Sequence, residues 1–230
     1  MIKIYGVRFK EKLDDKIFDS LLSIVGDIQT EKILKFKFWQ DRHRSLLGKL
    51  LVYHSLKNEF GIDKFPEIQY GNYGRPYQDI NPMYDFNITH SGEYVFFVIT
   101  DRGRIGIDVE KNKNISVEIA ERFFSEHEVR YLKKLPEKLM NHEMIKIWTL
   151  KESYIKAKGS TFLIPLDKFY FDISGSEIVF FTNLPEEKIE WKFDYFQMED
   201  NHQLSVCYEY GNNIISFSCE NLDDFVKYFI

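Results

Sequence analysis

The segment RIGIDVE at residues 104–110 decides how the fold is read. It follows a predicted tight turn at residues 101–103, and its apolar run predicts a strand. Because strand side chains point alternately to opposite faces, Asp108 and Glu110 share one face. Two carboxylates about 7 Å apart at the backbone repel each other unless a cation lies between them, and Mg²⁺ prefers such oxygen ligands. On this motif alone, two solvated carboxylates on an exposed strand remain the simpler interpretation.

Similar patterns lie on both sides of this strand. Before it, the sequence predicts a strand at 2–9, helices at 13–25 and 39–60, the second ending at Gly61, and strands at 65–70, 84–90 and 93–100. After it come predicted helices from Ser116 and Ser125, a long helix at 141–158 ending at Gly159, at least three strands and a short helix from Asn221. The pattern therefore predicts an α+β fold of two similar halves, 1–103 and 104–230. Each is a strand meander packed on a long helix, and the ligand cleft lies between them.

Composition excludes several classes of protein. The chain has 230 residues, 44% of them hydrophobic, and a formal net charge of −5, which is typical of a folded protein and not of a disordered or disulfide-stapled one. The mild acidity argues against general nucleic-acid binding. Cys207 and Cys219 lack metal-ligand spacing and are expected to be buried free thiols. No apolar run approaches the roughly 20 residues of a membrane span and no leader pattern follows Met1, so we expect a cytoplasmic protein.

A second cluster of charged residues lies on the predicted helix 141–158. We expect Trp148 to pack inward and Lys151, Glu152 and Lys156 to emerge side by side. Glu152 would then complete a carboxylate set with the strand, and the two ammonium groups would neutralise a pyrophosphate. An ordinary Glu–Lys pair on a solvated helix face explains the same residues more simply.

Further candidates lie in the first half. The stretch NITHSG at 87–92 ends a predicted strand with His90 beside hydroxyl groups and a glycine turn, which suits either anion binding or a structural histidine. Basic residues that can gather around a phosphate, or simply form a solvated surface, are Lys32, Lys35, Lys37, Arg42, Arg44 and Arg75. Neither a P-loop nor a G-x-G-x-x-G motif occurs, so the common nucleotide folds gain no support.

Five motifs in this order carry a resemblance to a known family: GRP (74–76), FNITHSG (86–92), IGIDVE (105–110), FFSEHE (123–128) and WTLKESYIKAKG (148–159). The chain resembles the 4′-phosphopantetheinyl transferases of the surfactin-synthetase-activating type. The resemblance covers nearly the whole chain and includes KIYG at 3–6 and HRSLLG at 43–48. It implies a monomer that transfers 4′-phosphopantetheine, with Mg²⁺, from coenzyme A to a serine of an apo acyl- or peptidyl-carrier protein and releases adenosine 3′,5′-bisphosphate. The carrier would serve fatty-acid, polyketide or non-ribosomal peptide (antibiotic) synthesis.

The resemblance also implies roles for individual residues. Asp108, Glu110 and Glu152 would ligate Mg²⁺, Lys151 and Lys156 would hold the pyrophosphate, Lys32, Arg44 and His90 would lie near the 3′-phosphate, and Gly74, Arg75, Pro76 and Thr89 would follow the adenosine. The catalytic residues would be Asp108, Glu152 and Lys156. Glu152, directly or through a metal-bound water, is the expected general base, and its rival Glu128 has an alternative role in a capping box with Ser125. The chain departs from the family pattern at Thr89 and Arg75, where serine and lysine are common, and at Gln29 in the first half.

Two other functions use the same residues. A Mg²⁺-dependent pyrophosphate hydrolase would replace the serine by water. A non-catalytic module would only bind coenzyme A or a carrier protein. The carrier-docking surface is expected in the second half, where Ile115, Val117 and Phe124 are equally explained by core packing.

Overall fold

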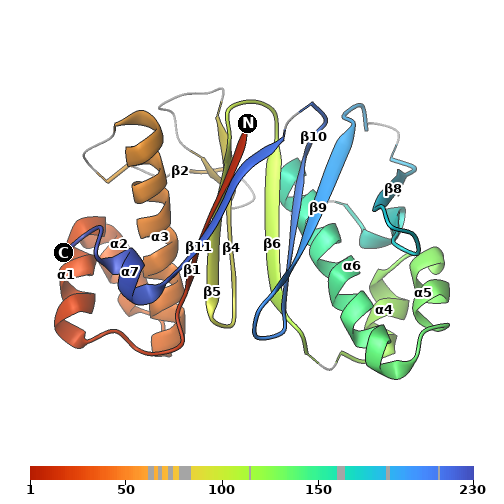
Figure 1. Ribbon diagram of the computed structural model, residues 1–230, viewed down its shortest axis with the longest axis horizontal. Coiled ribbons are helices and arrows are strands. Elements are labelled where there is room, and N and C mark those ends of the chain that lie inside the picture. Colours follow the sequence, from red (N-terminus) through yellow and green to blue (C-terminus); the bar gives the residue numbers. More distant parts are fainter. Residues whose placement is uncertain are drawn as a thin grey trace.

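The computed structural model describes residues 1–61, 65–66, 69–71, 75–77, 84–113, 115–159, 164–184, 187–211 and 213–230. Across the view of Figure 1, the layers follow one another as helices, a first sheet, a second sheet and further helices. Within the described ranges, no helix is both long and apolar enough to cross a membrane.

The first sheet has four strands in the order β11-β1-β5-β4. They are β1 (Ile2–Arg8), β4 (Asp85–Ser91), β5 (Tyr94–Thr100) and β11 (Ile214–Asn221). One face is covered by α1 (Asp15–Val25), α2 (Asp27–Leu34), α3 (Trp39–Phe60) and the short α7 (Leu222–Val226). The long helix α3 ends where expected, because Gly61 adopts the left-handed conformation that stops a helix.

The second sheet is antiparallel in the order β6-β10-β9. It consists of β6 (Ile105–Lys111), β9 (Trp191–Met198) and β10 (His202–Glu209). Packed with it are α4 (Val117–Phe123), α5 (Glu126–Leu132), α6 (Glu137–Lys158), the 3₁₀ turn η1 (Leu166–Lys168) and a hairpin of β7 (Phe169–Asp172) and β8 (Val179–Thr182). A small pair, β2 (Gln69–Tyr70) and β3 (Pro76–Tyr77), completes the described strands.

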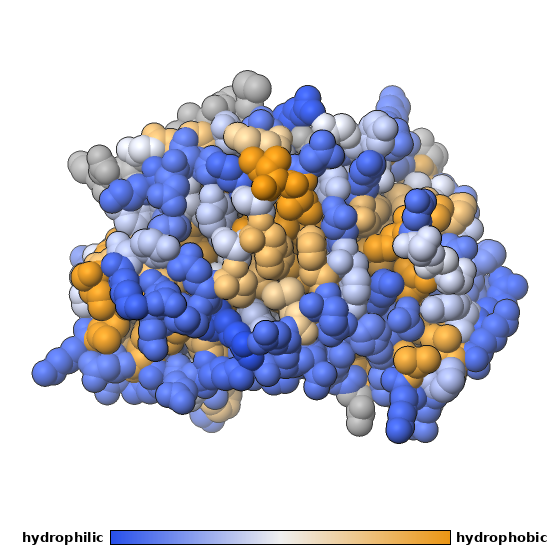
Figure 2. Space-filling model, viewed as in Figure 1, coloured by the Kyte–Doolittle hydropathy of each residue, from blue (hydrophilic) through white to orange (hydrophobic). Residues whose placement is uncertain are grey.

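The two sheets meet through an apolar core and through a polar seam. Side chains of both sheets, Ile4, Phe96 and Val98 from one and Ile107 and Val206 from the other, share one buried cluster. Figure 2 shows an apolar patch over the middle of this face of the molecule and smaller apolar groups among the hydrophilic residues toward its two ends. Burial between the sheets is therefore what holds the halves together.

At the seam, β4 and β6 are joined by side chains and not by a backbone ladder. The backbone N–H groups of Ile105, Ile107, Val109 and Lys111 donate to the side chains of Asp85, Asn87, Thr89 and Ser91, in that order, over 2.9–3.4 Å. The alternate polar residues of β4 thus satisfy the open edge of β6. This seam fixes the register in which the two halves meet.

Most predicted elements are confirmed, and one expectation, the burial of both cysteines, needs correction. The structure adds the helix α2 to the predicted elements. The division into halves at residue 103 stays a prediction, and the C-terminal segment lies with the first half, because β11 pairs in parallel with β1 and Leu222, Phe225 and Val226 of α7 pack into the first core. Cys207 is a buried free thiol, whereas Cys219 is exposed on the edge strand β11, where a neighbouring strand lies on one side only.

Candidate functional site

A glycine brings the carboxylate strand onto the long helix α6. A side chain at Gly106 would place its Cβ 2.1 Å from the carbonyl oxygen of Ser153 and 2.4 Å from the backbone nitrogen of Ala157, so no other residue allows this approach. Because β6 lies directly on α6, Asp108 of the strand reaches Lys156 of the helix.

Asp108 is the centre of the site. Its side chain is buried, and its Oδ1 accepts a hydrogen bond from Lys156 Nζ at 2.6 Å and one from Thr89 Oγ1 at 3.3 Å. Its Oδ2 is buried with no hydrogen-bond partner. Burial raises the pKa of Asp108 to about 7, Lys156 opposes this rise, and Glu110 and Glu152 add to it. A buried carboxylate with one unsatisfied oxygen is suited to binding a further cationic group.

Glu110 and Glu152 lie close enough to Asp108 to influence its ionisation. Glu110 accepts a hydrogen bond from Ser91 Oγ at 3.0 Å. The pKa of the half-buried Glu152 is raised, first by burial, and Glu110 adds to the rise while Lys156 opposes it. The structure therefore brings the three predicted carboxylates and Lys156 together.

The chemistry of this donor set fits a hard cation such as Mg²⁺, since all three groups offer carboxylate oxygens and Asp108 Oδ2 has no partner. In the described part of the chain, no group of three His, Cys, Asp or Glu side chains is already arranged to hold a metal ion.

A pocket of about 190 Å³ lies on the first half, between α3 and β4. It is lined by Phe36, Asp41, Arg44, Ser45, Gly48, Lys49, Ile88 and His90. The pKa of His90 is lowered by desolvation and then by the charges of Arg44 and Lys156. Two of the predicted phosphate-binding residues, Arg44 and His90, therefore meet in one cationic pocket. The third, Lys32, is exposed on α2 and lies near enough to Lys49 to lower the pKa of its ammonium group.

Lys151 does not lie with the three site carboxylates, Asp108, Glu110 and Glu152. The predicted contact of its ammonium group with the pyrophosphate is therefore corrected. Its side chain is fully buried, and its ammonium group donates to the carbonyl oxygens of Leu166 and Phe169, both at 2.7 Å, and pairs with Glu128 at 2.8 Å. These three partners use all three N–H donors of a lysine. The physical reason is helical geometry, because residues five apart are separated by about 140° around the helix, so Lys151 and Lys156 face different sides.

Glu128, the rival general base, is likewise placed in structural contacts. It forms the predicted capping box with Ser125 and also accepts a hydrogen bond from the backbone N–H of Phe171 at 3.0 Å. Its side chain is fully buried with Lys151 and does not lie among the three carboxylates.

Arg75 connects three elements of the seam. Its guanidinium donates to the carbonyl oxygens of Lys156 and Ile105 and pairs with Asp85 at 2.5 Å. The Arg75 guanidinium, which was expected to contact the adenosine, therefore binds these three protein groups instead. Gly74 lies outside the described residues, and Pro76 lies in the short strand β3.

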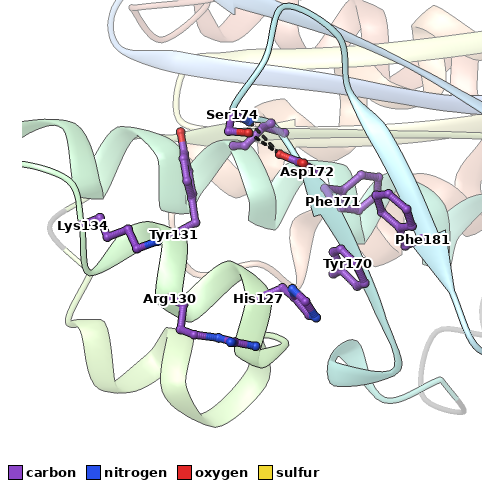
Figure 3. Close-up of a pocket in the computed structure, with 10 residues that line it drawn as sticks. His127, Arg130, Tyr131, Lys134, Tyr170, Phe171, Asp172, Ser174 and Phe181 are labelled. Atoms are coloured by element: carbon purple, nitrogen blue, oxygen red, sulfur yellow. Dashed lines mark hydrogen bonds between the residues drawn. The ribbon is translucent and has the colours of Figure 1, made fainter.

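Another pocket, of about 350 Å³, lies between α5 and the β7–β8 hairpin (Figure 3). Its wall includes a stack of three rings, His127 on Tyr170 and Tyr170 on Phe181, with centroids 4.5 and 4.7 Å apart. Asp172 at its rim accepts hydrogen bonds from Ser174. None of its lining residues is a predicted site residue.

The structure adds two residues to the predicted site. Ser91 binds Glu110, and its position two residues after Thr89 on one strand face is a signal that could have identified it. Lys49 lines the cationic pocket, and its position near Arg44 on α3 is the only sequence signal for it.

Comparison with known proteins identifies the family. A family model described as the 4′-phosphopantetheinyl transferase superfamily matches residues 104–207, and one described as the N-terminal part of 4′-phosphopantetheinyl transferase matches residues 13–101. The 4′-phosphopantetheinyl transferase ffp of Bacillus subtilis is 33% identical over 208 residues, which are 90% of this chain and 92% of the relative. The transferase gsp of Aneurinibacillus migulanus is 32% identical over 82% of this chain and 79% of its own.

A mouse L-aminoadipate-semialdehyde dehydrogenase-phosphopantetheinyl transferase is 26% identical over 77% of this chain and 65% of its own. The chain belongs to the 4′-phosphopantetheinyl transferase superfamily of enzymes and, within it, to the surfactin-synthetase-activating type. The family predicted from the five motifs is therefore confirmed.

Proposed function

We propose that this protein transfers 4′-phosphopantetheine from coenzyme A to a serine hydroxyl of an apo acyl- or peptidyl-carrier protein, depends on Mg²⁺ and releases adenosine 3′,5′-bisphosphate. The observation that carries the proposal is the buried Asp108, which has one oxygen paired with Lys156 and the other without a partner. A transferase of this kind must compensate the charge of a pyrophosphate, and a carboxylate set with an adjacent ammonium group suits that task.

The chain's own residues divide the work in this proposal. Mg²⁺, when bound by Asp108, Glu110 and Glu152, would compensate the charge of the pyrophosphate. Lys156 lies at the same carboxylate and donates hydrogen bonds to phosphate oxygens. The raised pKa of Glu152 makes it a better proton acceptor for the carrier serine. The cationic pocket with Arg44 and His90 holds the phosphate on the ribose.

The halves have separate roles in the proposal. The first supplies nucleotide contacts, and the second supplies the carboxylates and the carrier-docking surface. A pseudo-twofold relation between the halves, with the substrate in the cleft, is supported by the occurrence of a 22-residue helix against the sheet in each half. The protein acts in this proposal as a cytoplasmic monomer.

Transfer is measured with purified protein, Mg²⁺, coenzyme A and an apo carrier protein, by the phosphopantetheine mass increment on the carrier. We expect Asp108→Ala and Glu152→Ala to lower the rate on the order of 100-fold or more without unfolding the protein. Glu137→Ala, at an exposed position of the same helix α6, is the matched control and should keep full activity.

The outcomes separate the alternatives. No mass increment on several unrelated carriers, or full activity of both carboxylate variants, would overturn the proposal. Consumption of coenzyme A without any carrier would indicate a hydrolase. Coenzyme A binding that is indifferent to Mg²⁺ and leads to no reaction would indicate a binding module.

A further inference from the structure

Gln203 is a fully buried polar residue beneath helix α6, and none of the roles described above uses it. It lies on the central strand β10, directly opposite Glu110 of β6. Opposite residues of an antiparallel pair point to the same face, so Gln203 faces α6 together with Glu110 and Gly106. A buried amide costs free energy unless it is hydrogen-bonded, so its partners indicate its role.

The side chain of Gln203 connects the end of β6 to helix α6. Its Nε2 donates to Asn112 Oδ1 at 2.5 Å and to the carbonyl oxygen of His142 at 3.0 Å. Its Oε1 accepts a hydrogen bond from Tyr195 at 3.0 Å. Asn112 is the residue that follows β6, and His142 lies in the first half of α6. Both N–H donors of the amide are therefore used, one on each of the two elements.

This connection and Gly106 hold β6 against α6 at two separate places. Gly106 lies against Ser153, which is roughly 16 Å along the helix from His142. Asn112 lies about 20 Å along the chain from Gly106 if the extended conformation continues to it. The two carboxylates of β6 lie between these places on the strand, and Glu152 lies between them on the helix. Gln203 therefore acts on the two elements that carry all three site carboxylates.

We propose that Gln203 is a positioning residue for Mg²⁺, because it holds the strand with Asp108 and Glu110 in place against the helix with Glu152. The inference rests on the proposed function, since it takes Mg²⁺ as the ion that these carboxylates bind. Gln203 is not assigned to the reaction, because its Nε2 and Oε1 already bind other protein groups. Groups that orient the ligands of a metal typically change its affinity 10- to 100-fold.

The test measures the affinity for Mg²⁺ separately from activity. Gln203→Met keeps a side chain of similar length and removes both hydrogen-bonding groups. The Mg²⁺ dissociation constant is obtained from the increase in unfolding free energy with Mg²⁺ concentration, for the protein alone and with coenzyme A present. We expect Gln203→Met to weaken Mg²⁺ binding about 10-fold. In the transfer assay, the Mg²⁺ concentration that gives half the maximal rate should rise equally, whereas kcat at saturating Mg²⁺ should stay nearly unchanged.

Two further variants make the result specific. Asn112→Ala removes the acceptor at the end of β6 and should weaken Mg²⁺ binding in the same way, and the double variant should be no weaker than Gln203→Met. Asn112 is partly exposed, so this variant should fold even where the buried substitution does not. Tyr208→Phe is the matched control, because it removes a hydrogen bond of β10, to Asp194 at 2.6 Å, on the opposite face of the sheet. It should leave the Mg²⁺ dissociation constant unchanged.

The proposal is overturned if Gln203→Met and Asn112→Ala lower the unfolding free energy without changing the Mg²⁺ dissociation constant, which is the result expected of a purely structural amide. It is also overturned if Tyr208→Phe weakens Mg²⁺ binding equally, or if Mg²⁺ stabilises the unmodified protein in neither condition. The unfolding measurement needs no carrier and no transfer. A protein that binds Mg²⁺ through this arrangement but modifies no carrier would therefore refute the proposed function and leave the inference standing.

Discussion

Helix α6 supplies the lysines of two lysine–carboxylate pairs, which lie on different sides of the helix. The two pairs differ in how completely the carboxylate oxygens are hydrogen-bonded. Lys151 pairs with Glu128 at 2.8 Å, and both side chains are fully buried. Lys156 pairs with Asp108 at 2.6 Å, and its side chain remains 24% exposed. The distances are nearly equal, so the ion pair by itself does not distinguish the two regions.

The remaining hydrogen bonds make the distinction. Both oxygens of Glu128 are used, Oε2 by Ser125 and Lys151 and Oε1 by the N–H of Phe171. Oδ2 of Asp108, by contrast, is buried without a partner. A complete set of partners indicates a structural pair, and an unsatisfied buried oxygen indicates a site that awaits a ligand.

The largest expected effects come from removing the charge of each lysine in turn, which tests whether one pair is structural and the other belongs to the site. Lys151→Met leaves Glu128 buried without its cation, and we expect it to lower the free energy of unfolding by about 3–5 kcal/mol. Lys156→Met should leave the protein folded, because Lys156 is partly exposed and Asp108 can take up a proton, but it should lower the transfer rate by about 100-fold or more. Urea unfolding and carrier modification measure the two effects.

A double variant serves as the control for the structural pair. Lys151→Met with Glu128→Gln should be less destabilised than the sum of the single variants, since the uncompensated charge is gone. Equal losses of stability for Lys151→Met and Lys156→Met would contradict the division into a structural pair and a site pair.

The protonation of Asp108 gives the second prediction. Its pKa is raised from 3.8 to about 7 in the folded protein. Between pH 3.8 and about pH 7, the Asp108 side chain loses its proton in the unfolded chain but keeps it in the folded protein. The contribution of this proton to the free energy of unfolding is therefore complete below the unfolded pKa and is lost as the pH rises through about 7. For the protein without metal, linkage predicts a loss of about 2.5 kcal/mol between about pH 5 and pH 8.

Asp108→Asn should remove this part of the pH dependence, which urea unfolding at several pH values would show. Glu152→Gln is the comparison variant, because the pKa of Glu152 is also raised and should contribute in the same direction. An unfolding free energy with the same pH dependence in Asp108→Asn as in the unmodified protein would contradict the assignment.

Sequence reasoning found the members of the site where strand geometry decides. The alternation of side chains predicts that Asp108 and Glu110 lie on one face, and in the structure the charge of Glu110 contributes to the raised pKa of Asp108. The prediction that Lys151 emerges beside Glu152 and Lys156 was wrong, because two positions on a helix share a face only when they are three or four residues apart. The contacts of Lys151 come from Glu128 and from the turn at Leu166, which no local pattern connects to the helix.

The parts that could not be predicted depend on how distant segments meet. The approach of β6 to α6 requires Gly106 to lie against Ser153, and nothing in either segment alone reveals it. The return of β11 to β1 likewise depends on pairing across more than 200 residues.

The smallest expected effect comes from the hydroxyl group beside each pair. Thr89 Oγ1 accepts from Lys156 Nζ and from the N–H of Val109, both at 3.2 Å, and donates to Asp108. Thr89→Ser keeps these bonds and should leave the transfer rate nearly unchanged, whereas Thr89→Val removes them and should lower it about 10-fold.

Ser125 holds the corresponding place beside Glu128, where its hydroxyl donates to the carboxylate and accepts from the N–H of Glu128. Ser125→Ala should therefore lower the unfolding free energy by about 1 kcal/mol and leave the transfer rate of the folded protein unchanged. Carrier modification and urea unfolding of both variants complete the comparison. A loss of transfer in Ser125→Ala at full stability would mean that the pair of Lys151 and Glu128 belongs to the site after all, because a purely structural pair acts on activity only through folding.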